Sequence, residues 1–225
     1  MKFIEIMEAI MDKQLLFRAL LFNSGLVAMA FGIILTINSG LGVSPVTSLP
    51  FMVSLVTGVQ LGVCIAAIFS SFILIQIAML GKEFRYFRLL QIVVSAMFGY
   101  FVAFAGAIIG DFSMTTYAGQ ICMLMIGIML LSCGLAMSVE AKFVNMPAEE
   151  LVLVTAYKFR TTFHRAKILW DCAIVATSIT ISLVFMGKLQ GVREGTVIAA
   201  LLVGKLIPIM RKIILSATHA IGFKI

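Results

Sequence analysis

Charged residues are scarce in this chain of 225 amino acids, and their scarcity excludes a soluble globular domain. Asp, Glu, Lys and Arg make up 12% of the sequence, whereas hydrophobic residues make up 62% and the mean hydropathy is +1.14. A soluble domain carries about twice that charged fraction, because much of its surface must face water. The composition predicts an integral membrane protein, with the lipid bilayer as a partner, and it excludes intrinsic disorder.

Residues that carry enzymatic or redox chemistry are also sparse. His164 and His219 are too few for a His-rich metal site, and the four cysteines lie in apolar runs without a CxxC pair. Serine-hydrolase, P-loop, zinc-protease and dinucleotide-binding motifs are absent from the sequence. We therefore expect no enzyme, no metal, no cofactor and no nucleic-acid partner, and we interpret the net charge of +7 as a sign of membrane topology.

Six apolar runs are long enough to cross a membrane as helices. A helix rises about 1.5 Å per residue, so about 20 apolar residues span the hydrocarbon core of a bilayer. In lipid, an open chain satisfies its backbone polar groups only as helix, which predicts an all-α fold. The runs are Leu15–Ile37, Gln60–Leu80, Tyr86–Ile109, Tyr117–Val139, Lys167–Met186 and Glu194–Ile214.

The positions of the basic residues predict how these spans are oriented. With the N-terminus inside, all but two of the 17 Lys and Arg residues fall on the inner side, and only Lys188 and Arg193 fall outside. Lys and Arg near span ends collect on the cytoplasmic side. One missed or invented span would mix the two groups, so we expect six spans with both termini in the cytoplasm.

Two helix-length segments, Ser44–Gly58 and Met146–Thr162, are too short or too charged to span, and each begins with proline near its first helical position. A shift of 102 residues along the chain aligns Pro45 with Pro147. The order of span, Gly/Pro break, short helix, span and span then occurs twice. Because three spans are an odd number, the second unit must be inverted relative to the first, as in many secondary transporters.

The predicted fold is therefore an all-α integral membrane protein with six transmembrane helices, arranged as two inverted three-helix repeats. Residues 15–110 form the first repeat and residues 117–215 the second, and each repeat contains an extra short half-helix that starts with proline. Residues 1–14 are expected to form an amphipathic segment on the inner leaflet, and residues 216–225 a cytoplasmic tail.

Three sequence elements resemble one family of bacterial membrane proteins. They are the segment NSGLGVSP at Asn38–Pro45, Lys167 with Asp171, and the run QGVREGTVIAALLVG at Gln190–Gly204. Together they resemble the YczE/YyaS/YitT-like proteins over nearly the whole chain, and the Gln190–Gly204 run is the specific part. The resemblance implies a bacterial cytoplasmic-membrane protein of the kind often labelled a transporter. Lys205 departs from the proline or apolar residue expected after this run.

Among the residues of the predicted spans, Asp171 is the one whose insertion into the bilayer costs the most free energy. It lies six residues after Arg165, about 9 Å along a helix from the inner boundary. A charged residue near mid-helix costs about 2.5–3.5 kcal/mol on insertion scales, so it normally faces a partner or a watery cavity. Lys205 has a matching depth, six residues before Arg211. Three interpretations stay open: Asp171 binds substrate or relays protons, Asp171 and Lys205 form a structural ion pair, or Lys205 extends to the membrane surface and Asp171 is only hydrated.

The other candidate binding residues lie at the starts of three predicted helices. At the first break, hydroxyl and backbone groups would line a site if the break is buried, while a turn above the bilayer is the alternative. The carboxylates of the second short helix also suit its dipole, and they disfavour an anionic substrate. These candidates are Ser44, Pro45, Thr47, Glu149, Glu150, Glu194 and Thr196.

The function predicted from these features is a small-solute secondary transporter, coupled to a cation or proton or moving a neutral or cationic solute. The alternative is a non-transporting membrane protein, such as an assembly partner, a sensor or the substrate-binding subunit of a larger complex. A polar cavity between the halves would favour transport, and a solid apolar interior would favour the alternative. A homo-oligomer is left open by the sequence.

Overall fold

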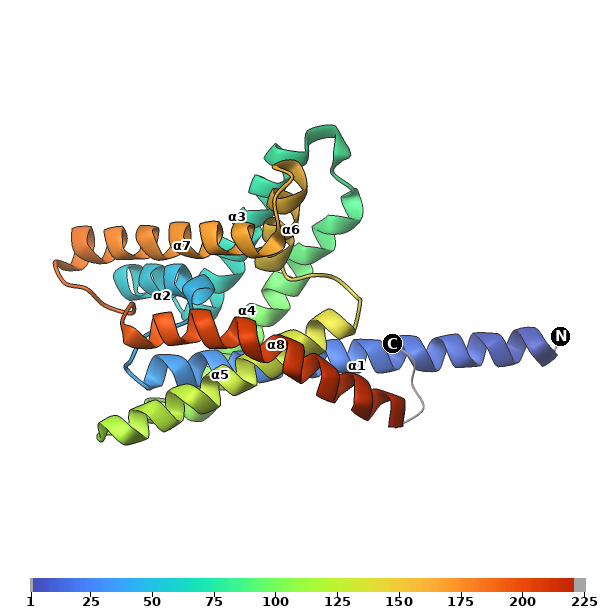
Figure 1. The fold of residues 1–225 in the computed structure, drawn as a ribbon, viewed down its shortest axis with the longest axis horizontal. Helices are drawn as coiled ribbons and strands as arrows, with labels where there is room; N and C mark the ends of the chain where they lie inside the picture. The colour runs from blue at the N-terminus through green and yellow to red at the C-terminus, as the bar shows by residue number, and fades with distance from the viewer. Residues whose placement is uncertain (1, 221–225) are drawn as a thin grey trace.

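The computed structural model describes the backbone of residues 2–220 and the side chains of residues 13–218, and this part of the chain is helical with no strand (Figure 1). The predicted all-α fold is confirmed. Two short 3-10 helices, η1 (Gly81–Glu83) and η2 (Tyr86–Leu89), connect α3 to α4. The α-helices are α1 (Lys2–Asn38), α2 (Pro45–Thr57), α3 (Leu61–Leu80), α4 (Leu90–Ile109), α5 (Tyr117–Glu140), α6 (Pro147–Lys158), α7 (Phe163–Met186) and α8 (Glu194–Ala220).

Five helical stretches are long and apolar enough to cross a membrane, which supports a multi-pass membrane protein. α8 is longer than any of α3, α4, α5 and α7, but Lys205, Arg211 and Lys212 lie along it and lower its apolar character. Its role as a sixth span stays a prediction. The five stretches are Lys13–Asn38, Leu61–Glu83, Tyr86–Ile109, Tyr117–Glu140 and Phe163–Met186.

The N-terminal segment is a continuation of the first span, since α1 runs without interruption from Lys2 to Asn38 and projects beyond the bundle (Figure 1). No glycine or proline occurs before Gly25 to end the helix. The predicted amphipathic character of residues 1–14 concerns side chains that lie mostly outside the described residues. At the other end, α8 extends to Ala220, so residues 216–220 of the expected tail are helical, and residues 221–225 lie outside the described part.

α1 and α5 form the most extensive helix–helix contact in the described part of the chain. A Cβ atom added to Gly25 would lie 2.7 Å from the carbonyl oxygen of Gly134, and one added to Gly32 would lie 2.7 Å from that of Gly127. The backbones approach this closely because neither partner has a side chain. The order of the contacts, with Gly25 opposite Gly134 and Gly32 opposite Gly127, makes the two helices antiparallel.

The remaining helices pack in two groups. α4 packs on α1 and α8 packs on α5, whereas α2 and α6 each pack on both α3 and α7. α3 and α4 join the two groups through Gly62, where an added Cβ atom would lie 2.2 Å from the carbonyl oxygen of Gly99. α7 and α8 barely touch within the described residues. The two short helices therefore lie among long helices rather than on the periphery.

The two short helices begin at proline, as the sequence predicts. Ser44 and Met146, the residues before them, have extended backbone conformations with ψ of 150° and 143°. Pro45 and Pro147 occupy the first helical turn, where the fixed φ of proline suits the helix and its missing N–H is not needed. Each break thus turns the chain sharply into a new helix.

Candidate functional site

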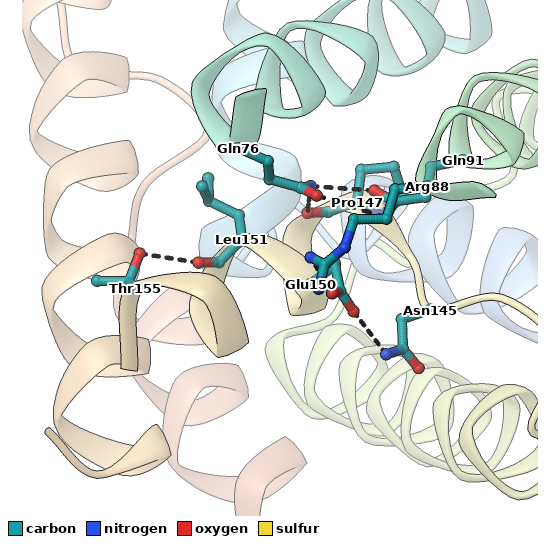
Figure 2. Close-up of polar contacts among 8 residues, drawn as sticks. All are labelled: Gln76, Arg88, Gln91, Asn145, Pro147, Glu150, Leu151 and Thr155. Carbon is teal, nitrogen blue, oxygen red and sulfur yellow. Dashed lines mark hydrogen bonds and ion pairs between the residues drawn. The ribbon is translucent and has the colours of Figure 1, made fainter. Parts of the chain in front are cut away.

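A pair of buried glutamines lies beside the start of α6 (Figure 2). Gln76 of α3 donates a hydrogen bond of 3.0 Å to the side-chain oxygen of Gln91 of α4 and another of 3.1 Å to the carbonyl oxygen of Pro147. Both glutamines are at most 2% exposed. A buried amide without partners is costly, and these contacts satisfy it. The pair therefore ties α3, α4 and the first turn of α6 together.

The carboxylate of Glu150 is held from two sides in the same region (Figure 2). Arg88, in η2 just before α4, forms an ion pair with Glu150 at 2.5 Å, and Asn145, in the α5–α6 connection, donates a hydrogen bond to it at 2.6 Å. The Glu150 side chain is 11% exposed. Because the carboxylate is largely removed from water, these partners offset the free-energy cost of burying it. We call Gln76, Gln91, Arg88, Asn145 and Glu150 the α6 cluster.

Asp171 and Glu149 lie near each other between α6 and α7. Lys167 donates to Asp171 at 2.6 Å, one helical turn away on α7. Burial raises the pKa of the Glu149 carboxyl, the positive charge of Lys167 counteracts this, and the negative charge of Asp171 raises the pKa further. The arrangement brings two carboxylates and one ammonium group into electrostatic contact, which suits the binding of a proton or a cation.

The interpretation that pairs Asp171 with Lys205 is wrong in this structure. Lys205 is exposed on α8, a helix that barely touches α7, and it has no ion pair within the described residues. Lys167 lies four residues before Asp171, on the same face of α7, and takes the place of the expected partner. Equal depth along two helices does not by itself bring two side chains together.

A small cavity of about 10 Å³ lies beside Glu149 and is lined also by Asn145 and Ser138. A cavity of this size has room for about one water molecule. The site is therefore wide enough for a proton or one water molecule and too narrow for an organic solute in this conformation.

Hydroxyl groups occupy the start of α2. The Ser44 and Thr47 hydroxyls lie 2.9 Å apart, and the Ser48 hydroxyl lies 2.9 Å from that of Ser178 on α7. Ser48 and Ser178 are fully buried. Ser48 also donates to the carbonyl oxygen of Pro45, so the first turn of α2 is closed by its own side chain. These residues contribute polarity without charge.

The break before α2 is exposed at Gly40 and buried in protein from Leu41 to Val43. Leu41 and Val43 are each 1% exposed. Ser178, which contacts the first turn of α2, lies eight residues before Met186, the end of α7, and therefore about 12 Å along the helix from that end. Irregular backbone at this depth is tolerated where protein covers it. Protein covers Leu41 and Val43, and the depth of the break relative to the bilayer stays a prediction.

The start of α8 covers this break. The Val43 N–H donates to the carbonyl oxygen of Gly191 at 3.0 Å, and the Gly195 N–H donates to that of Leu41 at 2.8 Å. Thr196 is 3% exposed and thus belongs to the same buried region. This contact explains the glycine at position 195, because a Cβ atom there would lie 2.7 Å from the Leu41 oxygen.

Glu194 lies apart from the buried residues. Its side chain is 43% exposed and forms an ion pair of 3.1 Å with Arg193, whose guanidinium also donates to the carbonyl oxygen of Gly40. Glu194 therefore helps to fasten the α8 start to the break from the surface. Eight of the nine candidates thus fall into two groups, one at the α2 and α8 starts and one around α6 and α7, and Lys205 belongs to neither.

Several residues of the site were not anticipated from the sequence. Arg88 and Asn145 lie in connections, where charged and amide residues are ordinary. Gln76 and Gln91 carry a usable signal, because each interrupts an apolar run expected to span the membrane, where polar side chains are rare and usually partnered. Glu140, 3% exposed at the end of α5, likewise pairs with Arg211 of α8.

Apolar helices, buried helix breaks and satisfied polar clusters together define the class as a helical multi-pass membrane protein. Within that class, the chain belongs to the DUF6198 family, a family of unknown function whose model matches residues 16–212. No curated protein matches the chain, and no solved structure matches it either.

Proposed function

We propose that the chain is a small-solute secondary transporter of a bacterial cytoplasmic membrane, similar to YczE/YyaS/YitT-like proteins. In this proposal α8 is the sixth span, both termini face the cytoplasm, and the spans form two inverted repeats, α1–α4 and α5–α8. Transport is coupled to a cation or proton, or the solute is itself neutral or cationic. The bilayer and a small molecule or ion are the partners.

Helix boundaries support the repeats. α1 ends at Asn38 and α5 at Glu140, a separation of 102 residues. The same separation relates the starts of α3 and α7, Leu61 and Phe163, and the two proline starts. The same spacing therefore relates one helix end, one short-helix start and one long-helix start, as is expected of two copies of one structural unit.

The packing also supports a two-fold relation. Adding 102 to Gly25 and Gly32 gives Gly127 and Gly134, so the contact of Gly25 with Gly134 becomes that of Gly127 with Gly32. The contact of α1 with α4 has its counterpart in α5 with α8, and that of α2 with α7 in α6 with α3. Corresponding helices that cross antiparallel are what an axis in the membrane plane produces.

The observation that carries the transport proposal is the pair of polar contacts at the short-helix starts. Ser178 contacts Ser48 near the start of α2, and Gln76 contacts Pro147 at the start of α6. Ser178 and Gln76 are 102 residues apart, so each long helix meets the short helix of the other half at an equivalent position. Interrupted segments in matching positions point to the binding site of a secondary transporter.

One difference between the halves supports two exchanging conformations. α3 and α4 are in close contact through Gly62 and Gly99, whereas α7 and α8 are separated. If the halves exchange roles, α7 approaches α8 while α3 leaves α4, and access to the site alternates between the two sides of the membrane. In this proposal Asp171 and Glu149 carry the coupled proton or cation.

A non-transporting protein is the second candidate, and the narrow interior favours it. The cavity beside Glu149 holds about 10 Å³, and the amides of Gln76 and Gln91 are bonded to each other rather than available to a solute. In that case the clusters would be structural supports in a subunit of a larger assembly.

Proteoliposomes separate the two candidates. We would reconstitute the full chain, impose a membrane potential, and record internal pH with a trapped dye, with and without a panel of cationic and neutral solutes. Transport predicts proton or solute flux that Asp171→Asn abolishes and Asp111→Asn, a matched change on an exposed connection, leaves intact. Flux no greater than in empty liposomes, or flux that survives Asp171→Asn, contradicts the proposal.

Distance measurements by pulsed electron paramagnetic resonance test the exchange directly. Spin labels at Leu169→Cys and Ile209→Cys report on α7 and α8, and labels at the equivalent Ala67→Cys and Ala103→Cys report on α3 and α4. We expect two distance populations in each pair, shifting in opposite directions when pH or solute changes. One fixed distance in both pairs contradicts alternating access.

A further inference from the structure

An open groove of about 710 Å³ lies between the α3–α4 connection and the exposed face of α6. Its charged lining is formed by Lys82, Glu83, Arg85, Arg88 and Glu150. The volume falls within the range typical of small-molecule sites. Since the α3–α4 connection joins the ends of two apolar stretches, the groove lies at a membrane surface rather than within the bundle.

The basic residues that line the groove outnumber the acidic ones. Lys82 and Arg85 are exposed, and neither has an ion pair within the described residues. Glu150 neutralises Arg88 through one guanidinium nitrogen, Nη1, while a guanidinium carries five N–H donors. With Glu83 and Glu150 counted against the three basic residues, the lining keeps a net positive charge. An anion with several acceptor oxygens would use these donors best.

The opposite wall of the groove is apolar. Leu153 and Tyr157 of α6 line it, at 42% and 68% exposure, and Phe84 adds an apolar side chain from the connection. Tyr86 and Phe87, beside the groove in sequence, are 86% and 64% exposed. Exposed aromatic residues next to basic ones at span ends are typical of the membrane–water interface. The groove therefore fits an anion attached to an apolar or amphipathic group.

We infer that this groove binds a phosphate group, carried either by an anionic phospholipid headgroup or by a soluble phosphate. Lys82 and Arg85 supply the charge, and the unused donors of Arg88 contact the phosphate oxygens. Occupation of the groove stabilises the α3–α4 connection against α6 and so favours the conformation in which Arg88 and Glu150 are paired. This binding site is separate from the transported solute and does not require the chain to be a transporter.

Thermal unfolding of the purified full chain in detergent tests the inference, with three probes added in parallel: phosphatidylglycerol, phosphatidylcholine and inorganic phosphate. The groove variant is Lys82→Gln with Arg85→Gln. The matched control is Arg165→Gln with Lys212→Gln, which removes the same charge from exposed positions outside the groove. A third variant, Lys82→Arg with Arg85→Lys, keeps the charge and reports on folding.

We expect phosphatidylglycerol, but not phosphatidylcholine, to raise the melting temperature of the unaltered chain, the control and the charge-keeping variant. The groove variant should need roughly thirtyfold more phosphatidylglycerol for half the effect, because each basic residue near a lipid surface contributes about fivefold in affinity. The same pattern with inorganic phosphate identifies a soluble source. Equal responses to the anionic probes in the groove variant and the control, or no response in any variant, overturn the inference.

Discussion

The two proline-started short helices share a backbone plan and differ in how they are held. Ser48 of α2 and Glu150 of α6 are 102 residues apart and occupy equivalent positions in the first turn. Ser48 contacts another hydroxyl, that of Ser178, whereas Glu150 is fixed by a guanidinium and an amide. One start is thus held by neutral groups and the other by charge, although the chain turns in the same way at both.

This difference implies unequal resistance to opening. A neutral hydrogen bond contributes about 1 kcal/mol to stability, whereas removing one partner of a buried ion pair costs about 3–5 kcal/mol. The α6 start is also tied to Gln76 of α3, a helix that packs on α4, and the α2 start lies beside α7, which is separated from α8. We therefore expect the α6 start to resist opening more strongly than the α2 start.

The largest effect should come from Glu150→Gln. The change leaves the half-buried Arg88 without its counter-charge, so we expect a loss of about 3 kcal/mol in the free energy of unfolding. Combining it with Arg88→Met removes the stranded charge and should recover most of the loss. Denaturant titration in detergent measures both, with Glu83→Gln on the exposed connection as control. If Glu150→Gln lowers the free energy of unfolding by less than about 1 kcal/mol, the α6 start is held no more strongly than the α2 start.

The next largest effect should come from Gly62→Ala. The new methyl group would lie 2.2 Å from the Gly99 oxygen and would force α3 away from α4, at a cost of about 1–3 kcal/mol. Gly106→Ala, on α4, meets only a side-chain carbon at 3.6 Å and serves as the matched control. Melting temperatures compare the two. Equal stability would mean that α3 and α4 are no closer in the membrane than α7 and α8.

A smaller effect is expected from Ser48→Ala at the position equivalent to Glu150. It removes hydrogen bonds to Ser178 and to the carbonyl of Pro45, for a loss of about 1 kcal/mol. Ser71→Ala provides the control, because Ser71 is exposed and bonds only to the backbone of its own helix. Urea titration of the two variants measures the difference. A cost equal to that of Glu150→Gln would show that charge makes no difference to the short-helix starts.

The smallest effect concerns pH at Glu149, the position equivalent to Thr47. Since burial raises the pKa of Glu149 in the folded chain, that chain keeps the proton at pH values where the unfolded chain has lost it. Stability should therefore fall as pH rises from the ordinary glutamate value through the raised one. Glu149→Gln should flatten this part of the melting profile, and Glu83→Gln should not. If melting temperature depends on pH in the same way in both variants, Glu149 is not the group that titrates.

Sequence patterns predicted the helices well because hydropathy and proline act locally. The start of α6 at Pro147 follows from the fixed φ of proline, and the apolar stretch Tyr117–Glu140 follows from length and composition alone. The ion pair of Arg88 with Glu150 joins η2 to α6, two elements far apart in the sequence, and no local pattern identifies such a partner. Asp171 illustrates the limit, since Lys167 of its own helix pairs with it in place of the predicted Lys205.

Lys82 and Lys188 give the most direct test of the central claim that the halves are inverted copies. Each follows the glycine that ends the third helix of its half, Gly81 or Gly187, so the two lysines are equivalent positions. In a cysteine-free background, an impermeant thiol reagent applied to intact cells should label Lys188→Cys, and should label Lys82→Cys only after the cells are opened. Labelling of both from the same side of the membrane would contradict the inverted arrangement.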